Sequence, residues 1–221
     1  MPELKETKKY TFTVEGETEK WYFDWLEEQI NACEDAAYRA SIISKVQQSP
    51  SKFAKSQTSF STPAIVHICD VESNEPEHKK KFTDILDQID QSNKLGKKIK
   101  YGLGYSNFTF ELWIALHKVN CNGPLTHRSQ YLTHINRAFG EKFEDLDHYK
   151  KEDNFKRCLS KLTLKDVKTA IEKSERIMEN NESDPGKKPV IYKKFKYYED
   201  NPSLTIWEHV KRILDDCGVN E

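Results

Sequence analysis

The feature that most constrains the fold is a short apolar run, A-I-V-H-I-C at residues 64–69, which lies between Pro63 and Asp70. A short continuous apolar segment bounded in this way is typical of a strand that is buried on both faces of a parallel sheet. Strands of a parallel sheet are joined by crossover segments, usually helices, that cover the sheet. The run therefore predicts a central parallel strand in an α/β fold.

Strand and helix patterns alternate over the first half of the chain. Residues typical of strands concentrate in three further segments, at residues 10–15, 41–46 and 98–103. Apolar residues at helical spacing predict helices at residues 19–31, 78–93 and 107–117. Thr18 is the expected N-cap of the first helix, and residues 47–63 predict an exposed loop with room for one helical turn. The alternation indicates a mostly parallel sheet flanked by helices.

The pattern changes after residue 118. A loop is followed by three helical patterns, at residues 129–139, 164–180 and 204–217. At about 150 residues per domain, a chain of 221 residues makes one large domain, or one domain with a small appendage. We therefore expect an α/β core at residues 1–118 and a helical C-terminal extension at residues 119–221 that packs on it.

Composition narrows the classes of function. Lys and Arg total 35 and Asp and Glu total 36, a formal net charge of −1, so any nucleic-acid site must be local. The five cysteines include no C-x-x-C pair, which favours reduced thiols in the cytoplasm over a disulfide framework or a zinc site. A charged N-terminus and the lack of any run of about 18 apolar residues argue against a signal peptide and a membrane span. We expect a cytoplasmic protein.

Three carboxylates follow two of the expected strands: Glu15 closes the first strand, and Asp70 and Glu72 follow the apolar run. Ligands gather at the carboxyl ends of parallel strands, where loops converge. Carboxylates packed closely repel one another unless one takes up a proton or a cation lies between them. Oxygen ligands without His or Cys favour Mg²⁺ or Mn²⁺, which would position a phosphodiester. The alternative is that each residue is a helix cap or a solvated loop residue.

A basic and aromatic strip follows the turn-like D-P-G-K-K-P. Three lysines, Lys193, Lys194 and Lys196, alternate with aromatic residues. Lysines can contact phosphates while aromatic rings stack on unpaired bases, so these lysines are candidate nucleic-acid contacts. The alternative is a surface segment whose aromatic rings cover the helical extension. Residues 79–81 are expected on a solvated helix surface. The acidic stretch 141–153 would repel nucleic acid and is expected to face elsewhere or to meet a protein partner.

Four segments of the chain, in order, resemble the RloB-like family, also called AbiLii, whose members carry a TOPRIM-like nuclease core. They are V-E-G-E-T-E (14–19), I-C-D-V-E (68–72), S-N-F-T-F-E-L-W-I-A-L-H (106–117) and Y-Y-E-D-N-P-S (197–203). Two positions depart from the family pattern. Phe108 replaces a common Pro, and Glu72 stands where a second Asp is common, so its longer side chain would weaken or reposition a metal ion.

The resemblance implies a TOPRIM-like fold with a four-stranded, mostly parallel sheet flanked by helices. It implies that Glu15 acts in acid/base chemistry or binds metal, and that Asp70 and Glu72 bind Mg²⁺. Glu19 is a further candidate ligand, although a glutamate in a first helical turn also stabilises the helix dipole. Glu111, one turn into the next helix, is a candidate that points toward the metal cluster.

The third motif supplies three further candidates. Ser106 and Asn107 precede a helix whose N-terminus could hold a phosphate, although both residue types are also ordinary N-caps. His117 ends the motif and is either a catalytic residue or a hydrogen-bonded residue of the core. Glu111 and His117 are six residues apart and therefore do not share a helix face.

The resemblance implies a Mg²⁺-dependent nuclease that cleaves DNA or RNA, including tRNA, in bacterial defence against phage. Family members are commonly encoded beside an ATPase, and this chain contains no G-x-x-x-x-G-K-[ST] loop of its own. We therefore expect a partner ATPase. The alternative function is a non-catalytic binding or effector subunit with the same fold.

Overall fold

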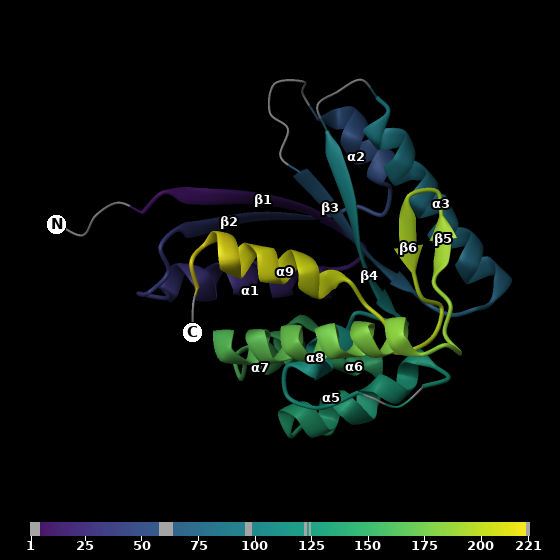
Figure 1. Ribbon diagram of the computed structural model, residues 1–221. Helices are drawn as coiled ribbons and strands as arrows, with labels where there is room; N and C mark the ends of the chain where they lie inside the picture. Colours follow the sequence, from purple (N-terminus) through teal and green to yellow (C-terminus); the bar gives the residue numbers. More distant parts are fainter. Residues whose placement is uncertain (1–4, 58–63, 96–98, 122, 124, 220–221) are drawn as a thin grey trace.

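Four parallel strands form the centre of the protein. The computed structural model describes residues 5–57, 64–95, 99–121, 123 and 125–219. The strands lie in the order β2-β1-β3-β4, and each pairing is parallel: β1 (Thr7–Val14), β2 (Arg39–Val46), β3 (Ala64–Val71) and β4 (Lys100–Asn107) (Figure 1). The predicted α/β class and parallel sheet are confirmed. The apolar run lies in β3, between β1 and β4, as a buried strand should.

Helices cover both faces of this sheet. The connections carry α1 (Glu17–Ala32), α2 (Pro50–Ser56) and α3 (Pro76–Asn93). Alternate residues of a strand point to opposite faces: Ile68 packs in the core that contains α1, whereas Ile65 and Cys69 pack in the core that contains α2 and α3. Figure 1 shows α2 and α3 on one side of the sheet and α1 and α9 (Ile206–Asp216) on the other.

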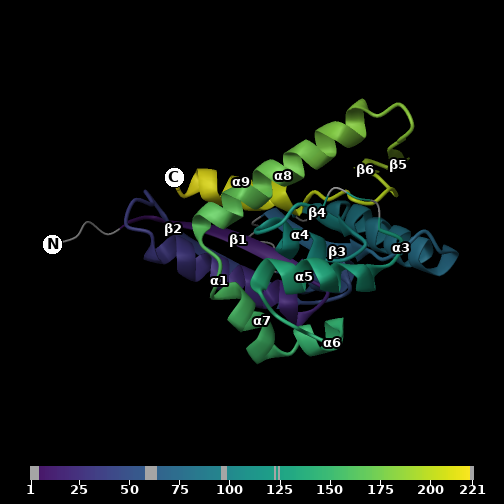
Figure 2. The ribbon, with the colours of Figure 1, turned by 90° about the horizontal axis from the view of Figure 1, so that it is seen from below.

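The C-terminal extension is helical, as predicted, but it also contains a hairpin. The first half of the chain ends with α4 (Glu111–Leu116). The helical elements of the extension before α9 are a 3₁₀ turn η1 (Arg128–Gln130), α5 (Tyr131–Phe139), α6 (Leu146–Tyr149), α7 (Glu152–Leu159) and α8 (Leu164–Ser183). The hairpin of β5 (Val190–Tyr192) and β6 (Phe195–Tyr197) follows α8, which reaches from α7 to the hairpin in Figure 2. No helix in the described ranges is long and apolar enough to cross a membrane.

The extension shares the hydrophobic core of the first half. Residues of α1, α4, α8 and α9 belong to one buried cluster, and α9 packs on β4. The division of the chain after residue 118, into a core and an extension, stays a prediction.

Two predicted element ends are wrong. α1 begins at Glu17 with the extended Gly16 as its N-cap, and Thr18 lies inside the helix, where its hydroxyl donates to Glu19. β4 continues to Asn107, because its ladder with β3 extends to the pair Val71–Asn107. The short helix α4 consequently begins at Glu111, four residues later than predicted.

The end of β4 is held by the closing segment of the chain, an arrangement that we call the β4 clamp. The Asn107 side chain donates to the carbonyls of Tyr198 (3.0 Å) and Glu199 (2.9 Å), and its backbone N–H donates to Ser203 O (2.9 Å). In return, Asn201 Nδ2 donates to Asn107 O (2.8 Å) and to the Tyr131 hydroxyl (2.7 Å). Asn107 is completely buried, and these bonds satisfy its side-chain N–H groups, its backbone N–H and its carbonyl, whereas its Oδ1 has no hydrogen-bond partner among the described residues. The clamp therefore fixes the chain between β4 and α4.

Replacing Asn201 by alanine is expected to destabilise the protein by about 2–4 kcal/mol, because it leaves buried polar partners unpaired at about 1–3 kcal/mol each. The matched control is Asn180→Ala on the exposed surface of α8, for which we expect a change within about 0.5 kcal/mol. Urea unfolding of both variants measures the difference. Equal stabilities would show that the clamp contributes nothing.

Candidate active site

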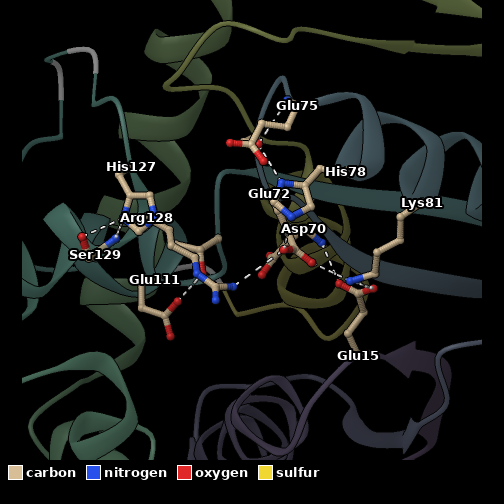
Figure 3. Close-up of polar contacts among 12 residues, drawn as sticks. Glu15, Asp70, Glu72, Glu75, His78, Lys81, Glu111, His127, Arg128 and Ser129 are labelled. Atoms are coloured by element: carbon tan, nitrogen blue, oxygen red, sulfur yellow. Dashed lines mark hydrogen bonds and ion pairs between the residues drawn. The ribbon is translucent and has the colours of Figure 1, made fainter.

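The predicted carboxylates meet where β1 and β3 end. These strands are neighbours, with Val14 paired to Ile68, so Glu15, directly after β1, lies close to Asp70 near the end of β3. Glu15 Oε2 accepts a hydrogen bond from the backbone N–H of Asp70 at 3.1 Å. Figure 3 shows Glu15, Asp70 and Glu72 grouped together, with Glu111 approaching from the side opposite to Lys81.

Asp70 lies at the middle of this group. It is the next-to-last residue of β3, and the buried Ser106 of β4 faces it in the ladder and donates its hydroxyl to Asp70 Oδ1 at 3.1 Å. The end of β4 thus positions the carboxylate. Because the β4 clamp fixes Asn107, it also fixes the serine beside it.

Two more carboxylates reach the group from helices. Glu19, in the first turn of α1, is 5% exposed, and Glu111, at the start of α4, is 0% exposed. Glu111 accepts the hydroxyl of Thr109, and its other oxygen, Oε1, lies 3.2 Å from Lys150 Nζ. Burying a carboxylate costs free energy, and one ion pair with a partly exposed lysine offsets only part of that cost. Packing alone therefore does not account for the buried Glu111.

Burial and mutual repulsion shift the acid strengths of this group. Burial, together with the charges of Glu19, Glu15 and Glu111, holds the pKa of Asp70 well above its usual value. Burial also raises the pKa values of Glu15 and Glu19. These shifts mean that negative charge is in excess around Asp70.

Glu72 lies in a different electrostatic environment. Lys81 Nζ is 2.5 Å from Glu72 Oε1, and His78 Nε2 (3.3 Å) and Arg128 Nη1 (3.8 Å) approach Oε2. Partial burial raises the pKa of this carboxyl, but the cations lower it more, so the result lies below the usual value. Lys81 also approaches Glu15 Oε1 at 3.8 Å and joins the two carboxylates.

The group opens into a cavity of about 290 Å³. Its lining includes residues from β1, α1, β3, α3 and the segment after α6: Glu15, Glu19, Asp70, Glu72, Lys81 and Lys150. Within the described parts of the chain, no three Asp, Glu, His or Cys side chains already converge on one point that a metal ion could occupy. The donors are nevertheless all carboxylate oxygens with excess negative charge, which is the chemistry that Mg²⁺ or Mn²⁺ requires.

The predicted residues Ser106, Asn107 and His117 do not line the cavity. Asn107 is part of the clamp, and Ser106 donates a hydrogen bond to Asp70. Both side chains are completely buried, so neither is placed to contact nucleic acid. Nor does either residue begin a helix, because β4 continues through both. His117 is 1% exposed and lies 3.2 Å from the Tyr22 hydroxyl and 2.9 Å from Trp113 O. Burial lowers the pKa of His117 to about 4, as expected of a core histidine.

The predicted nucleic-acid lysines of the hairpin do not line the cavity. Lys193 pairs with Asp87 (2.5 Å), Lys196 pairs with Glu182 (2.6 Å), and Lys194 lies over the ring of Phe195 (5.4 Å). Phe195 and Tyr197 pack into the core beside α3. The hairpin is thus a surface segment, but its aromatic rings cover the α3 side of the sheet and not, as the alternative had expected, the helical extension.

Sequence reasoning missed every cation of the site. Lys81 was expected on a solvated helix surface, but it bridges Glu15 and Glu72. Lys150 was expected to face elsewhere with the acidic stretch 141–153, but it pairs with Glu111; the acidity of that stretch is absorbed locally where Glu141 pairs with Arg157 (3.1 Å) and Lys161 (2.6 Å). No local pattern in the sequence identifies these lysines, because Glu72 is nine residues from Lys81, beyond the spacing of neighbours on one helix, and Glu15 and Glu111 are farther from their lysines.

The fold and site define a class: an α/β protein with a parallel sheet and an acidic site at the carboxyl ends of neighbouring central strands. The chain belongs to the RloB-like protein family, whose sequence model matches residues 10–213. This match includes all the carboxylates of the site and the β4 clamp. No curated protein and no solved structure matches the chain.

Replacing Asp70 by asparagine is expected to stabilise the metal-free protein at neutral pH. The pKa of Asp70 is raised by folding, so its ionisation opposes folding above the usual Asp value of 3.8 and has no effect well below it. We expect a gain of about 0.5–2 kcal/mol at neutral pH, at roughly 2–4 °C in Tm per kcal/mol, and none in acid.

Thermal unfolding in EDTA measures this gain, with Asp153→Asn at an exposed position as the control. A Tm at neutral pH that is unchanged or lower than that of the wild type would contradict the raised pKa of Asp70.

Proposed function

We propose that the protein is a divalent-metal-dependent nuclease with a TOPRIM-like core that hydrolyses phosphodiester bonds in DNA or RNA. The observation that carries the proposal is the group of carboxylates around Asp70, whose pKa is held well above its usual value. Such a group loses energy in the folded protein unless a cation compensates it, so a functional role accounts for its cost.

In this proposal, Glu15 and Asp70 hold Mg²⁺ or Mn²⁺, with Glu19 and Glu111 as the nearby carboxylates that complete the negative field. Glu72 would become a further metal ligand once Lys81 moves away from it. A bound divalent ion would neutralise phosphate charge and lower the pKa of a water molecule. Glu15 lies at the cavity wall, and among the described residues its one hydrogen bond comes from Asp70 N–H, so it is placed to accept a proton from an attacking water molecule.

The cations at the rim of the cavity support a phosphate-bearing substrate. Lys81 and Arg128 have side chains that are each 53% exposed, and both approach the site through Glu72. A rim of exposed cations above buried carboxylates can bind phosphate without raising the net charge of the whole protein, which is −1.

The biological setting follows from the family. We propose a cytoplasmic role in bacterial defence against phage, with tRNA among the RNA substrates and with a separate ATPase as partner, since the sequence lacks a phosphate-binding loop of the G-x-x-x-x-G-K-[ST] type.

A non-catalytic effector subunit is the second candidate. The ion pairs of Lys81 and Lys150 favour it, because they partly neutralise the carboxylates without any metal ion. The two functions differ in metal binding: a nuclease must bind Mg²⁺ or Mn²⁺ at the carboxylates, whereas a subunit of this kind has no need to.

The double substitution Asp70→Ala/Glu72→Ala is expected to abolish Mn²⁺ binding and Mn²⁺-dependent cleavage of mixed DNA and RNA. The control, Glu172→Ala/Glu179→Ala, removes the same charge from exposed positions of α8 and should bind and cleave as the wild type does. Calorimetry followed by gel assays measures both. A folded wild type that binds no Mn²⁺ at millimolar concentration would refute the nuclease and leave the effector subunit.

The Mn²⁺ affinity of the wild type is expected to fall as the pH is lowered, starting above the usual range of carboxylates. Metal binding requires ionised carboxylates, and the pKa of Asp70 is raised, so protons compete at higher pH than they would at an ordinary aspartate. Each competing proton costs about a factor of ten in affinity per pH unit below its pKa. Calorimetric titrations between neutral and mildly acidic pH measure this dependence, and a flat profile would contradict it.

A further inference from the structure

Lys150 is delivered to the cavity by a rigid anchor. It directly follows α6, and its backbone N–H donates to Leu146 O at 2.8 Å. The preceding residue, Tyr149, is completely buried and packs edge-on against Phe143 and Phe155, with ring centroids 5.6 and 5.5 Å apart. A lysine on such a support has little freedom at its backbone, and only its flexible stem can move.

The ammonium of Lys150 faces both a buried charge and the open cavity. Nζ lies 3.2 Å from Glu111 Oε1, an oxygen that has no other polar partner among the described residues, while the lysine side chain is 36% exposed. Lys150 lines the same cavity as Asp70 and Glu15. The charge is therefore held beside the carboxylates without being sealed among them.

The two lysines of the cavity approach it from different elements. Lys81 comes from α3 and bridges Glu15 and Glu72, and Figure 3 places it on the opposite side of Asp70 from Glu111, the partner of Lys150. Lys81 is occupied by two carboxylates. Lys150 has a single ion-pair partner among the described residues, and a cation bound at the carboxylates would take over that partner.

We infer that Lys150 is a catalytic residue whose ammonium binds an oxygen of the phosphate that is cleaved; this inference rests on the proposed nuclease function. In hydrolysis, water gives its hydroxyl to phosphorus and its proton to the ester oxygen that leaves, so the atoms balance without a proton from Lys150. Lys150 stays charged and stabilises the negative charge that grows on the phosphate oxygens in the transition state. An ammonium is suited to this role because it is a compact charge on a flexible stem.

The test compares Lys150→Met with Lys156→Met on the nucleic acid that the wild type cleaves. Lys156, six residues away on α7, also forms an ion pair, with Glu152 at 2.6 Å, but it does not line the cavity. We expect Lys150→Met to lower kcat by about 100-fold, the loss typical of removing one donor to a transition-state oxyanion. Its Mn²⁺ affinity should be unchanged or higher, because a competing cation is gone. Lys156→Met should match the wild type.

Lys150→Arg separates catalysis from a merely structural role. It keeps the positive charge that the buried Glu111 requires but alters the reach toward phosphate, so we expect an unchanged Tm and a kcat between those of the wild type and Lys150→Met. This variant also decides the matter if Lys150→Met does not fold. A fully active Lys150→Arg with an inactive, metal-free Lys150→Met would assign Lys150 a structural role only.

The failure of this inference and the failure of the proposed nuclease function give different results. If the wild type cleaves and Lys150→Met cleaves with the same kcat, this inference is wrong and the nuclease function stands. If the wild type binds Mn²⁺ and cleaves neither DNA nor RNA, the nuclease function and this inference are refuted together.

Discussion

The hydrogen bonds of the β4 clamp are the constraint on which the geometry of the site depends. Three strands deliver side chains to the site from one edge of the sheet, but the chain beyond β4 has no further strand to hold it. Residues 198–203 take that place, with an antiparallel bridge between Ser106 and Leu204 beside the Asn107 bonds. The last tenth of the chain therefore sets where Ser106 meets Asp70 and where Glu111 begins α4. This explains in physical terms why a family resemblance that concerns an acidic site also includes a closing segment without acidic ligands.

Burying the carboxylates of the site costs free energy, which the packing of the rest of the fold must offset. Glu19 and Glu111 are nearly or fully buried, and each raises the pKa of Asp70 because like charges repel in a poorly solvated place. The core that supports them is large and aromatic: the ring of Tyr22 packs against Phe110 and Trp113 at 5.7 and 6.0 Å, and His117 joins the same stack. We interpret His117 as part of this support, because a neutral imidazole between Tyr22 and Trp113 satisfies polar groups that a purely apolar side chain would leave unpaired.

The sequence was sufficient for the sheet and for the position of the carboxylates, and insufficient for their partners. The strands were predictable because apolar runs and turn residues are local signals, and strand ends in a parallel sheet meet at a common edge. The hairpin was missed because its loop, Lys193–Lys194, lacks the Gly or Asn that usually marks a tight turn, although Lys193 has a positive φ of 54°. Lys81 and Lys150 were missed for a different reason: an ion pair between residues on different elements leaves no trace in the local pattern, even where only nine residues separate Lys81 from Glu72.

The two lysines also explain how such a site folds before any ligand arrives. Five carboxylates in one small region would repel strongly, yet Lys81 and Lys150 each bring a positive charge to one flank. Their effects differ: the pKa of Glu72 beside Lys81 is lowered, whereas that of Asp70, which no lysine contacts among the described residues, is raised. The nearby cations thus outweigh burial at Glu72 on the rim, whereas burial and like charges prevail at Asp70 in the centre. Binding of a cation or a proton is therefore most favourable at the centre, around Asp70, and binding of a phosphate is most favourable at the rim. The charge distribution thus favours a metal ion inside the cavity and the substrate at its opening.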